Sequence, residues 1–274
     1  MPIPVEELVV SEVHPVNVGT RRELWIDGTL IDRLRGSARL TLHHPTPQEI
    51  VMVHDAPWEG NTCAYHTIFR DGDRVRMYYR GSQGDPSSSE QGHRPVTCYA
   101  ESPDGLHWTK PELGLVAFQG STANNILREG VGSHNFTPFK DPNPEADPEA
   151  QYKAVGGLRR EGGLFAFGSP DGLHWQQLGE GPIITDGTFD SQNVAFWDAA
   201  RGTYRAYVRD FRGGEAPFEG VRDIKTRTSD DFLHWSEPVW LDYGDAPETH
   251  IYTNQIMPYP RAPHLLIGFP TRFL

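Results

Sequence analysis

Three aspartates of the chain each have a histidine at the same spacing, and such pairs could take part in catalysis or metal binding. Asp104, Asp171 and Asp231 lie in the stretches SPDGLHW (102–108 and 169–175) and SDDFLHW (229–235), each three residues before a histidine. Such carboxylates could be catalytic, and the histidines could bind a metal. A reaction centre, however, needs different residues in different roles, whereas these copies are equivalent. We therefore interpret each aspartate as the hydrogen-bond acceptor of a tight turn, favoured by the neighbouring Ser, Pro and Gly residues.

The repeated turns divide the chain into similar segments. The tryptophans that end the copies, Trp108, Trp175 and Trp235, lie 67 and 60 residues apart. Short alternating apolar runs between turn formers are typical of antiparallel strands. They predict first strands at 66–71, 135–141 and 193–198, and second strands at 74–81, 151–157 and 203–210. A third strand is expected to lead into each copy, and a fourth to begin at its tryptophan.

Four antiparallel strands per unit are typical of the blades of a β-propeller. We expect an all-β, five-bladed propeller that forms a single domain over 1–274 and is incomplete in this chain. Its predicted parts are N-terminal strands (1–54, with a hairpin at Asp27–Gly28), blades at 55–118, 119–185 and 186–247, and a partial blade at 248–274. Because a half-built blade would leave an unpaired edge, we interpret the chain as a fragment or a truncated member of its group.

The composition excludes several classes of function. The net charge is −12, from 37 acidic and 25 basic residues, and without a basic cluster we expect no nucleic-acid partner. No apolar run reaches the length of a membrane span and no signal peptide is visible, so we expect a cytoplasmic protein, or a secreted one if the chain is a fragment. The two cysteines, Cys63 and Cys98, have no zinc-ligand spacing, so we expect neither metal nor cofactor. The oligomeric state stays open.

Polar residues head the first strand of every predicted blade. These strands lie nearest the central channel of a propeller, so their starts converge at one mouth, where hydrogen-bonding side chains could contact sugar hydroxyls. Capping of turns is the alternative role. The predicted substrate-binding residues are Trp58, His66, His134, Asn135, Gln192, Asn193, Tyr252 and Asn254.

The S-x-D-x-x-x-W repeat, the length of the units and the acidic composition resemble the five-bladed β-propeller glycoside hydrolases. These comprise the arabinanase/xylosidase-like (family 43) and invertase/levanase-like (family 32) groups and their uncharacterised relatives. The resemblance covers roughly residues 55–274. It implies an oligo- or polysaccharide substrate whose glycosidic bond is cleaved by two carboxyl groups, one an acid and the other a nucleophile or base.

Three carboxylates near the predicted mouth are the candidates for this chemistry. We favour Glu59, Asp190 and Glu248, because they come from three different blades. The sequence nevertheless departs from the pattern that the resemblance implies. An aspartate is expected near Ala64 and another at Asn135, and a glutamate is expected where only Asp190 stands.

Other functions therefore remain open. The main alternative to hydrolysis is a non-catalytic carbohydrate-binding propeller, and a scaffold for protein partners is a third possibility. Cys63 is a conceivable nucleophile, although no base is placed for it. Arg128, Arg209 and Arg212 could hold a phosphate or a carboxylated sugar.

Overall fold

The computed structural model describes residues 16–84, 92–216 and 218–273, and the regular structure of this part is almost entirely β. Its first sheet is antiparallel, in the order β1-β2-β3-β4. The bounds are β1 Ala64–Asp71, β2 Arg74–Gly81, β3 Val96–Ser102 and β4 Ile126–Glu129. The predicted second strand of this unit has the same bounds as β2.

Two further four-stranded sheets repeat this order, and two short pairs follow. The second sheet contains β5 Thr137–Lys140, β6 Tyr152–Gly156, β7 Phe165–Ser169 and β8 Gln176–Leu178. The third contains β9 Val194–Asp198, β10 Thr203–Gly213, β11 Gly220–Ser229 and β12 Val239–Trp240. The pairs are β13 His250–Ile251 with β16 Arg272–Phe273, and β14 Met257–Tyr259 with β15 Ala262–Ile267. The predicted all-β class with four-stranded antiparallel sheets is confirmed, while the five-blade count stays a prediction.

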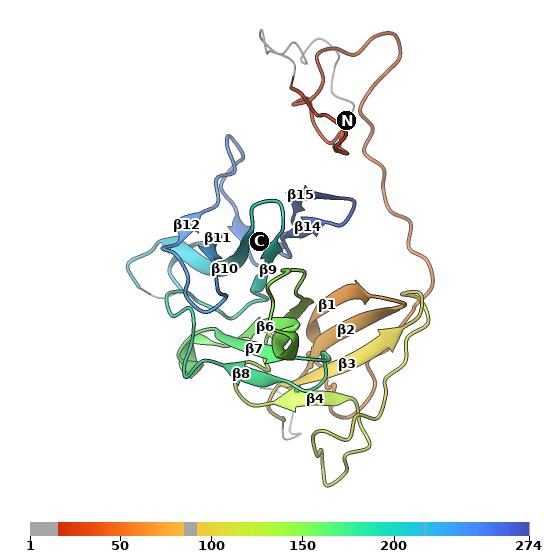
Figure 1. The fold of residues 1–274 in the computed structure, drawn as a ribbon, viewed down its shortest axis with the longest axis vertical. Helices are drawn as coiled ribbons and strands as arrows, with labels where there is room; N and C mark the ends of the chain where they lie inside the picture. Colours follow the sequence, from red (N-terminus) through yellow and green to blue (C-terminus); the bar gives the residue numbers. More distant parts are fainter. Residues whose placement is uncertain (1–15, 85–91, 217, 274) are drawn as a thin grey trace.

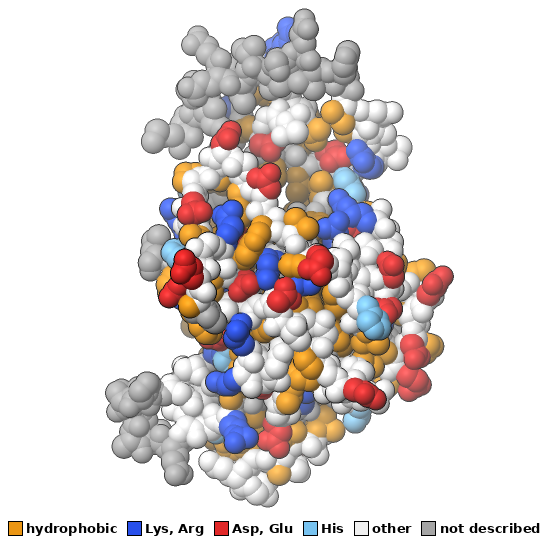
Figure 2. Space-filling model, turned by 90° about the vertical axis from the view of Figure 1, so that its left-hand side faces the viewer, with side chains coloured by type: hydrophobic (Ala, Val, Ile, Leu, Met, Phe, Trp, Pro, Cys, Tyr) orange, Lys and Arg blue, Asp and Glu red, His pale blue; other side chains and the backbone are white. Residues whose placement is uncertain are grey.

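The sheets follow one another along an arc, from β1–β4 through β5–β8 to β9–β12 (Figure 1). Apolar side chains pack between neighbouring sheets. Tyr78 and Tyr99 of the first sheet meet Ala154 and Phe167 of the second. In the same way, the second sheet packs against the third, and the third packs against Ile251 and the β14–β15 pair. On the face drawn in Figure 2, acidic, basic and hydrophobic side chains are intermixed.

The repeated turns have the hydrogen bonds that the sequence predicts. In the first copy, Asp104 Oδ1 accepts from the backbone N–H groups of Leu106 (2.8 Å) and His107 (2.9 Å), and Oδ2 lies 2.7 Å from His107 Nδ1. The Trp108 indole donates to the Gly105 carbonyl at 2.9 Å. The second and third copies repeat these contacts within 0.2 Å. The turn interpretation of the three aspartates is confirmed.

Aspartates that follow the first strands join neighbouring sheets. Asp71 Oδ2, at the end of β1, accepts a hydrogen bond from the Tyr152 hydroxyl of the second sheet at 2.7 Å. Asp141 Oδ2, after β5, accepts one from the Tyr204 hydroxyl of the third sheet at 2.6 Å. Each carboxylate is buried and also pairs with a cation of its own unit, Arg76 for Asp71 and Lys153 for Asp141.

Two expectations about strands are wrong. The fourth strand begins next to the tryptophan of the repeat only in the second sheet, where β8 follows Trp175 directly. In the first sheet, Pro111 lacks the N–H that a ladder needs, so pairing after Trp108 is limited to one bridge between Glu101 and Thr109, and β4 lies further along the chain. Residues 1–15 lie outside the described residues, and the described residues 16–63 form no strand. A turn does form at Asp27–Gly28, where the Ile31 N–H donates to the Gly28 carbonyl, but no strands flank it.

None of the helices that the structure describes has the length and apolar character that a membrane span requires.

Candidate functional site

The candidate site is a pocket of about 190 Å³ between the second and third sheets. The segments before β5 and before β9, the turn after β6 and the loop between β10 and β11 line the pocket. In antiparallel sheets these four segments lie at the same end of the strands. Its centre is the pair formed by His134 before β5 and Asp190 before β9, whose Nε2 and Oδ1 atoms lie 3.0 Å apart. The lining residues are His134, Leu158, Arg159, Arg160, Thr188, Phe189, Asp190 and Phe218.

Asp190 is an ionised carboxylate at neutral pH. The hydrogen bond from His134 lowers the pKa of Asp190 against the opposing effect of burial, and the positive charges of Arg209 and Arg80 act in the same direction. The side chain is nevertheless 61% exposed, so a ligand can reach it. Such a carboxylate can accept hydrogen bonds from hydroxyl groups, or act as a base or nucleophile.

His134 has two competing partners. Its Nε2 atom lies 3.0 Å from Asp190 Oδ1 and 3.0 Å from Arg80 Nη1. A carboxylate only accepts and a guanidinium only donates, so one ring nitrogen satisfies one partner at a time. The tautomer of His134 therefore selects the partner: with the proton on Nε2 the ring donates to Asp190, and with the proton on Nδ1 it accepts from Arg80.

Aromatic hydroxyls lie beside this pair. Tyr65 of β1 and Tyr252, which follows β13, have hydroxyl oxygens 2.7 Å apart, so the first sheet meets the last part of the chain here. The Tyr65 ring packs edge-on against His134, with ring centroids 5.7 Å apart, and lies under the Arg80 guanidinium. Gln192 Nε2 donates to Thr67 Oγ1 at 2.9 Å and to the His66 carbonyl. Starts of strands that are distant in sequence thus converge.

The asparagines predicted to contact a ligand are buried and bind backbone instead. Asn135 Nδ2 donates to the carbonyls of Gly157, Phe189 and Ser191 at 2.7–3.0 Å, and its Oδ1 accepts from the Gly157 N–H at 2.8 Å. Asn193 and Asn254 also use their amides on backbone carbonyls. These contacts match the turn-capping alternative.

Glu59, predicted as a catalytic carboxylate, is fully buried. Its oxygens accept from the Tyr79 hydroxyl (2.6 Å), Lys110 Nζ (2.8 Å), the Ala56 N–H (2.8 Å) and His54 Nδ1 (3.2 Å). Burial alone would raise the pKa of Glu59, but these donors lower it to about 2. An enclosed, ionised carboxylate of this kind neither reaches a sugar nor donates a proton, so the structure does not support the predicted catalytic role.

Glu248 and Trp58 also lie away from the pocket lining. Glu248 is 63% exposed and lies 3.4 Å from Arg212 Nη2. The Trp58 indole donates to Asn125 Oδ1 at 2.6 Å, and its ring packs on the apolar core of the first sheet. Of the predicted site residues, the pocket lining contains His134 and Asp190.

The arginines considered for anion binding are dispersed. The Arg128 guanidinium lies over the Phe167 ring, 4.0 Å from its centroid, and Arg212 pairs with Asp223 at 3.0 Å. Arg209 is buried and donates to the Thr188 carbonyl at 3.0 Å. The pocket lining contains Arg159 and Arg160 instead, which lie in a short 3-10 helix (Arg159–Glu161). The sequence pattern does not single out these two residues.

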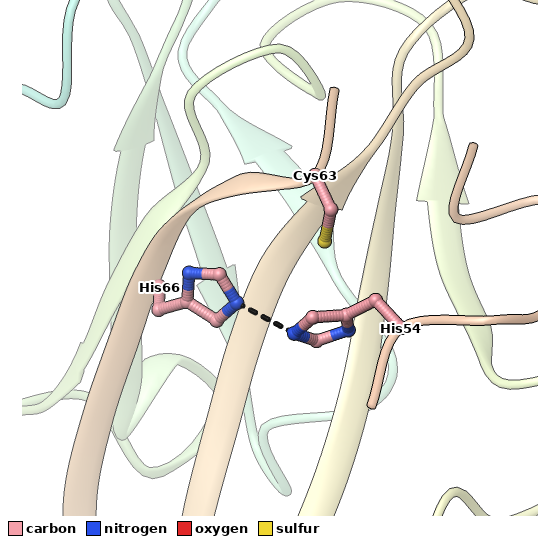
Figure 3. Close-up of side chains that lie close together, drawn as sticks. All are labelled: His54, Cys63 and His66. Carbon is pink, nitrogen blue, oxygen red and sulfur yellow. Dashed lines mark hydrogen bonds between the residues drawn. The ribbon is translucent and has the colours of Figure 1, made fainter. Parts of the chain in front are cut away.

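A second cluster lies beside the start of β1 and consists of His54, Cys63 and His66 (Figure 3). Their potential ligand atoms all lie within 4.8 Å of one another, and the two Nε2 atoms are 2.9 Å apart. Burial, together with the adjacent His54, lowers the pKa of His66 to about 4, so its ring is neutral. Burial and the charge of Glu59 raise the pKa of the Cys63 thiol to about 12, so Cys63 is not an activated nucleophile.

The sequence pattern did not predict this cluster. His54 precedes the first strand in an irregular segment, and nothing in its neighbourhood marks it as a partner of Cys63 and His66. The C-x-x-H spacing of Cys63 and His66 was the available signal. In a regular strand, however, residues three apart point to opposite faces.

No family model matches the chain. Two uncharacterized proteins of Mycobacterium tuberculosis are each 26% identical to it over 138 residues, which is 49% of this chain and 41% of theirs, so the chain spans less than half their length. The fold is similar to that of a glycosyl hydrolase from Bacteroides ovatus (TM-score 0.42, 17% identity, 77% of this chain and 66% of that one). It is also similar to a fructofuranosidase from Schwanniomyces occidentalis (TM-score 0.47, 17% identity, 76% of this chain and 40% of that one).

Proposed function

We propose that the chain is a carbohydrate-active protein that holds a sugar in the pocket between the second and third sheets. The observation that carries this proposal is the Asp190–His134 pair in an open pocket beside Phe218, whose side chain is 56% exposed. Sugars combine hydroxyl groups with apolar ring faces. A carboxylate and an imidazole beside an exposed aromatic ring match both features.

Hydrolysis is the first form of this function. Asp190 is ionised, so it suits the base or nucleophile of a glycosidase better than the acid. The leaving group would then be protonated by a second carboxyl group or by another acid. Asp190 is the one carboxylate among the described residues that line the pocket.

Sugar binding without cleavage is the second form. Three observations favour it: Glu59 is enclosed, Glu248 is held in a surface ion pair, and the described part of the pocket lining contains a single carboxylate. Arg159 and Arg160 add positive charge to the lining of a chain whose net charge is −12. Acidic sugars are therefore included among the ligands to be tested.

A panel of neutral and acidic oligosaccharides, tested for both binding and product release, decides between the two forms. Binding with release of shorter sugars indicates a hydrolase, and binding without product indicates a sugar-binding module. If no glycan binds at millimolar concentration, both forms are wrong.

A further inference from the structure

The imidazoles and the thiol of His54, Cys63 and His66 face one point because the start of β1 is irregular. The pairing of β1 with β2 shifts register between Ala64 and Thr67, and Tyr65 has a φ of 57°. A bulge of this kind interrupts the alternation of side chains, so Cys63 and His66 can project to the same side. In Figure 3 the Cys63 sulfur points toward the space between the two rings. A non-glycine residue at positive φ is costly and is often found at functional sites.

Glu59 fixes the orientation and the tautomer of His54. An ionised carboxylate can only accept a hydrogen bond, so the 3.2 Å contact with Glu59 Oε1 places the proton of His54 on Nδ1. The lone pair is then on Nε2, which accepts the 2.9 Å hydrogen bond from His66 Nε2, so an ion that binds both nitrogens would shift the His66 proton to Nδ1. A carboxylate behind the second nitrogen of an imidazole is the usual support of a metal-binding histidine.

Tyr79 contacts both imidazole rings. Its ring stacks on His66 with an interplanar angle of 10° and also contacts His54, with centroids 4.6 Å apart. The Tyr79 hydroxyl donates to Glu59, so the tyrosine and the carboxylate form one rigid support. The two imidazoles are thus pre-positioned.

We propose that His54, Cys63 and His66 bind a divalent transition-metal ion, for which Zn²⁺ is the best match. Two imidazole nitrogens and one sulfur are donors that Zn²⁺ prefers, whereas Ca²⁺ and Mg²⁺ require oxygen ligands. Tetrahedral Zn²⁺ with bonds near 2.0 Å needs its two nitrogens roughly 3.3 Å apart. The 2.9 Å separation in the structure is within a few tenths of an ångström of that value.

Three protein ligands leave the fourth position of a tetrahedral ion open to water or to an oxygen of a ligand. An ion with an open position can polarise a bound carbonyl group or activate a water molecule. Arg80 connects the two sites, because it donates to the Thr62 carbonyl at 2.9 Å, next to Cys63, and contacts His134 of the pocket. The metal site does not depend on the proposed sugar site, and it can exist without it.

Zn²⁺ titration of the full chain, expressed without a histidine tag and freed of metal with a chelator, tests the proposal. Calorimetry is expected to give one Zn²⁺ per chain. With Co²⁺ as a spectroscopic probe, the complex is expected to show thiolate-to-cobalt charge-transfer absorption. Cys63→Ser should abolish that absorption and weaken Zn²⁺ binding at least tenfold, and His66→Gln should weaken Zn²⁺ binding by a similar factor.

Cys98→Ala is the matched control, because Cys98 is the other thiol and is fully buried in the core of the first sheet. This variant should keep both the absorption and the affinity, and circular dichroism verifies that each variant is folded. The proposal is overturned if the wild-type chain binds no Zn²⁺. It is also overturned if folded Cys63→Ser and His66→Gln variants bind Zn²⁺ as tightly as the wild type.

Discussion

The Tyr78 hydroxyl donates a hydrogen bond to the Gly172 carbonyl at 3.0 Å, and so joins the first sheet to the repeated turn of the second. Arg76 Nη1 adds a contact to the neighbouring Asp171 carbonyl at 2.8 Å. At Gly105, in the identical stretch at 102–108, no atom of the described residues lies within 4 Å of the position that a Cβ would occupy. Two identical sequences therefore have different surroundings.

This difference predicts unequal effects of one substitution. Gly105 and Gly172 both have positive φ (84° and 79°), so alanine at either should cost about 1–2 kcal/mol of backbone strain. At Gly172 the added methyl group would also lie 2.7 Å from Arg76 Nη1 and 2.9 Å from the Tyr78 hydroxyl, whereas at Gly105 it would meet none of the described residues within 4 Å. Urea unfolding should show that Gly172→Ala is the more destabilising variant. Equal losses would contradict the joint between the sheets.

Asn135→Ala should lower the free energy of unfolding by about 2–3 kcal/mol, because it removes the partner of several buried backbone groups. Gln151→Ala is the control, since the Gln151 amide is exposed and its loss should change the stability by less than about 0.5 kcal/mol. Chemical denaturation measures both. If Asn135→Ala is fully stable yet loses glycan binding, the amide contacts the ligand, as the sequence predicted.

Glu59→Ala should destabilise the fold by about 2–4 kcal/mol, because it leaves Lys110 and the Tyr79 hydroxyl without their buried acceptor. Glu112→Ala, at an exposed position, provides the control. The unfolding free energies of both variants are compared with that of the wild type. Unchanged stability together with complete loss of glycan turnover would instead restore Glu59 to a catalytic role.

The repeated turns should make the protein sensitive to acid. Burial opposes ionisation of Asp171, but hydrogen bonds from the backbone and ring of His174 lower its pKa below the usual value. Because the folded pKa lies well below the unfolded one, the stabilisation is fully present above about pH 5, begins to be lost as the pH falls through the usual aspartate value, and continues to be lost below pH 3. Asp171→Asn should therefore reduce the dependence of unfolding free energy on pH in that range, by at most one proton.

Asp73→Asn, in which an acid that is 94% exposed is replaced, is the comparison for this measurement. The slope of unfolding free energy against pH between about pH 3 and 5 is the readout, so a constant loss of stability does not obscure the result. Identical slopes for wild type and Asp171→Asn would show that the turn carboxylate does not contribute.

The sequence predicts the parts of the fold that depend on local pattern. The alternation over 74–81 reproduces β2, and the chemistry of Ser, Asp and Gly identifies the turns. The fourth strand of the first sheet is expected directly after Trp108 but lies at Ile126–Glu129, because Pro111 interrupts the pairing next to the tryptophan.

The candidate site depends on contacts that pattern does not encode. In the sequence, a polar residue at the head of a strand that lines a pocket, such as His134, cannot be told from one that binds backbone carbonyls, such as Asn135. Similarly, the positive φ of Tyr65 re-aims His66 toward Cys63, and no local signal in the sequence marks that bulge.

The most direct test of the sugar site compares the Kd of the best glycan from the panel for the wild type, Asp190→Ala and Glu180→Gln. Glu180 is an exposed acid outside the lining of the pocket, so it controls for the loss of one negative charge. We predict that Asp190→Ala weakens binding at least tenfold, about 1.4 kcal/mol, while Glu180→Gln binds like the wild type. An unchanged Kd for a folded Asp190→Ala variant would contradict the assignment of this pocket.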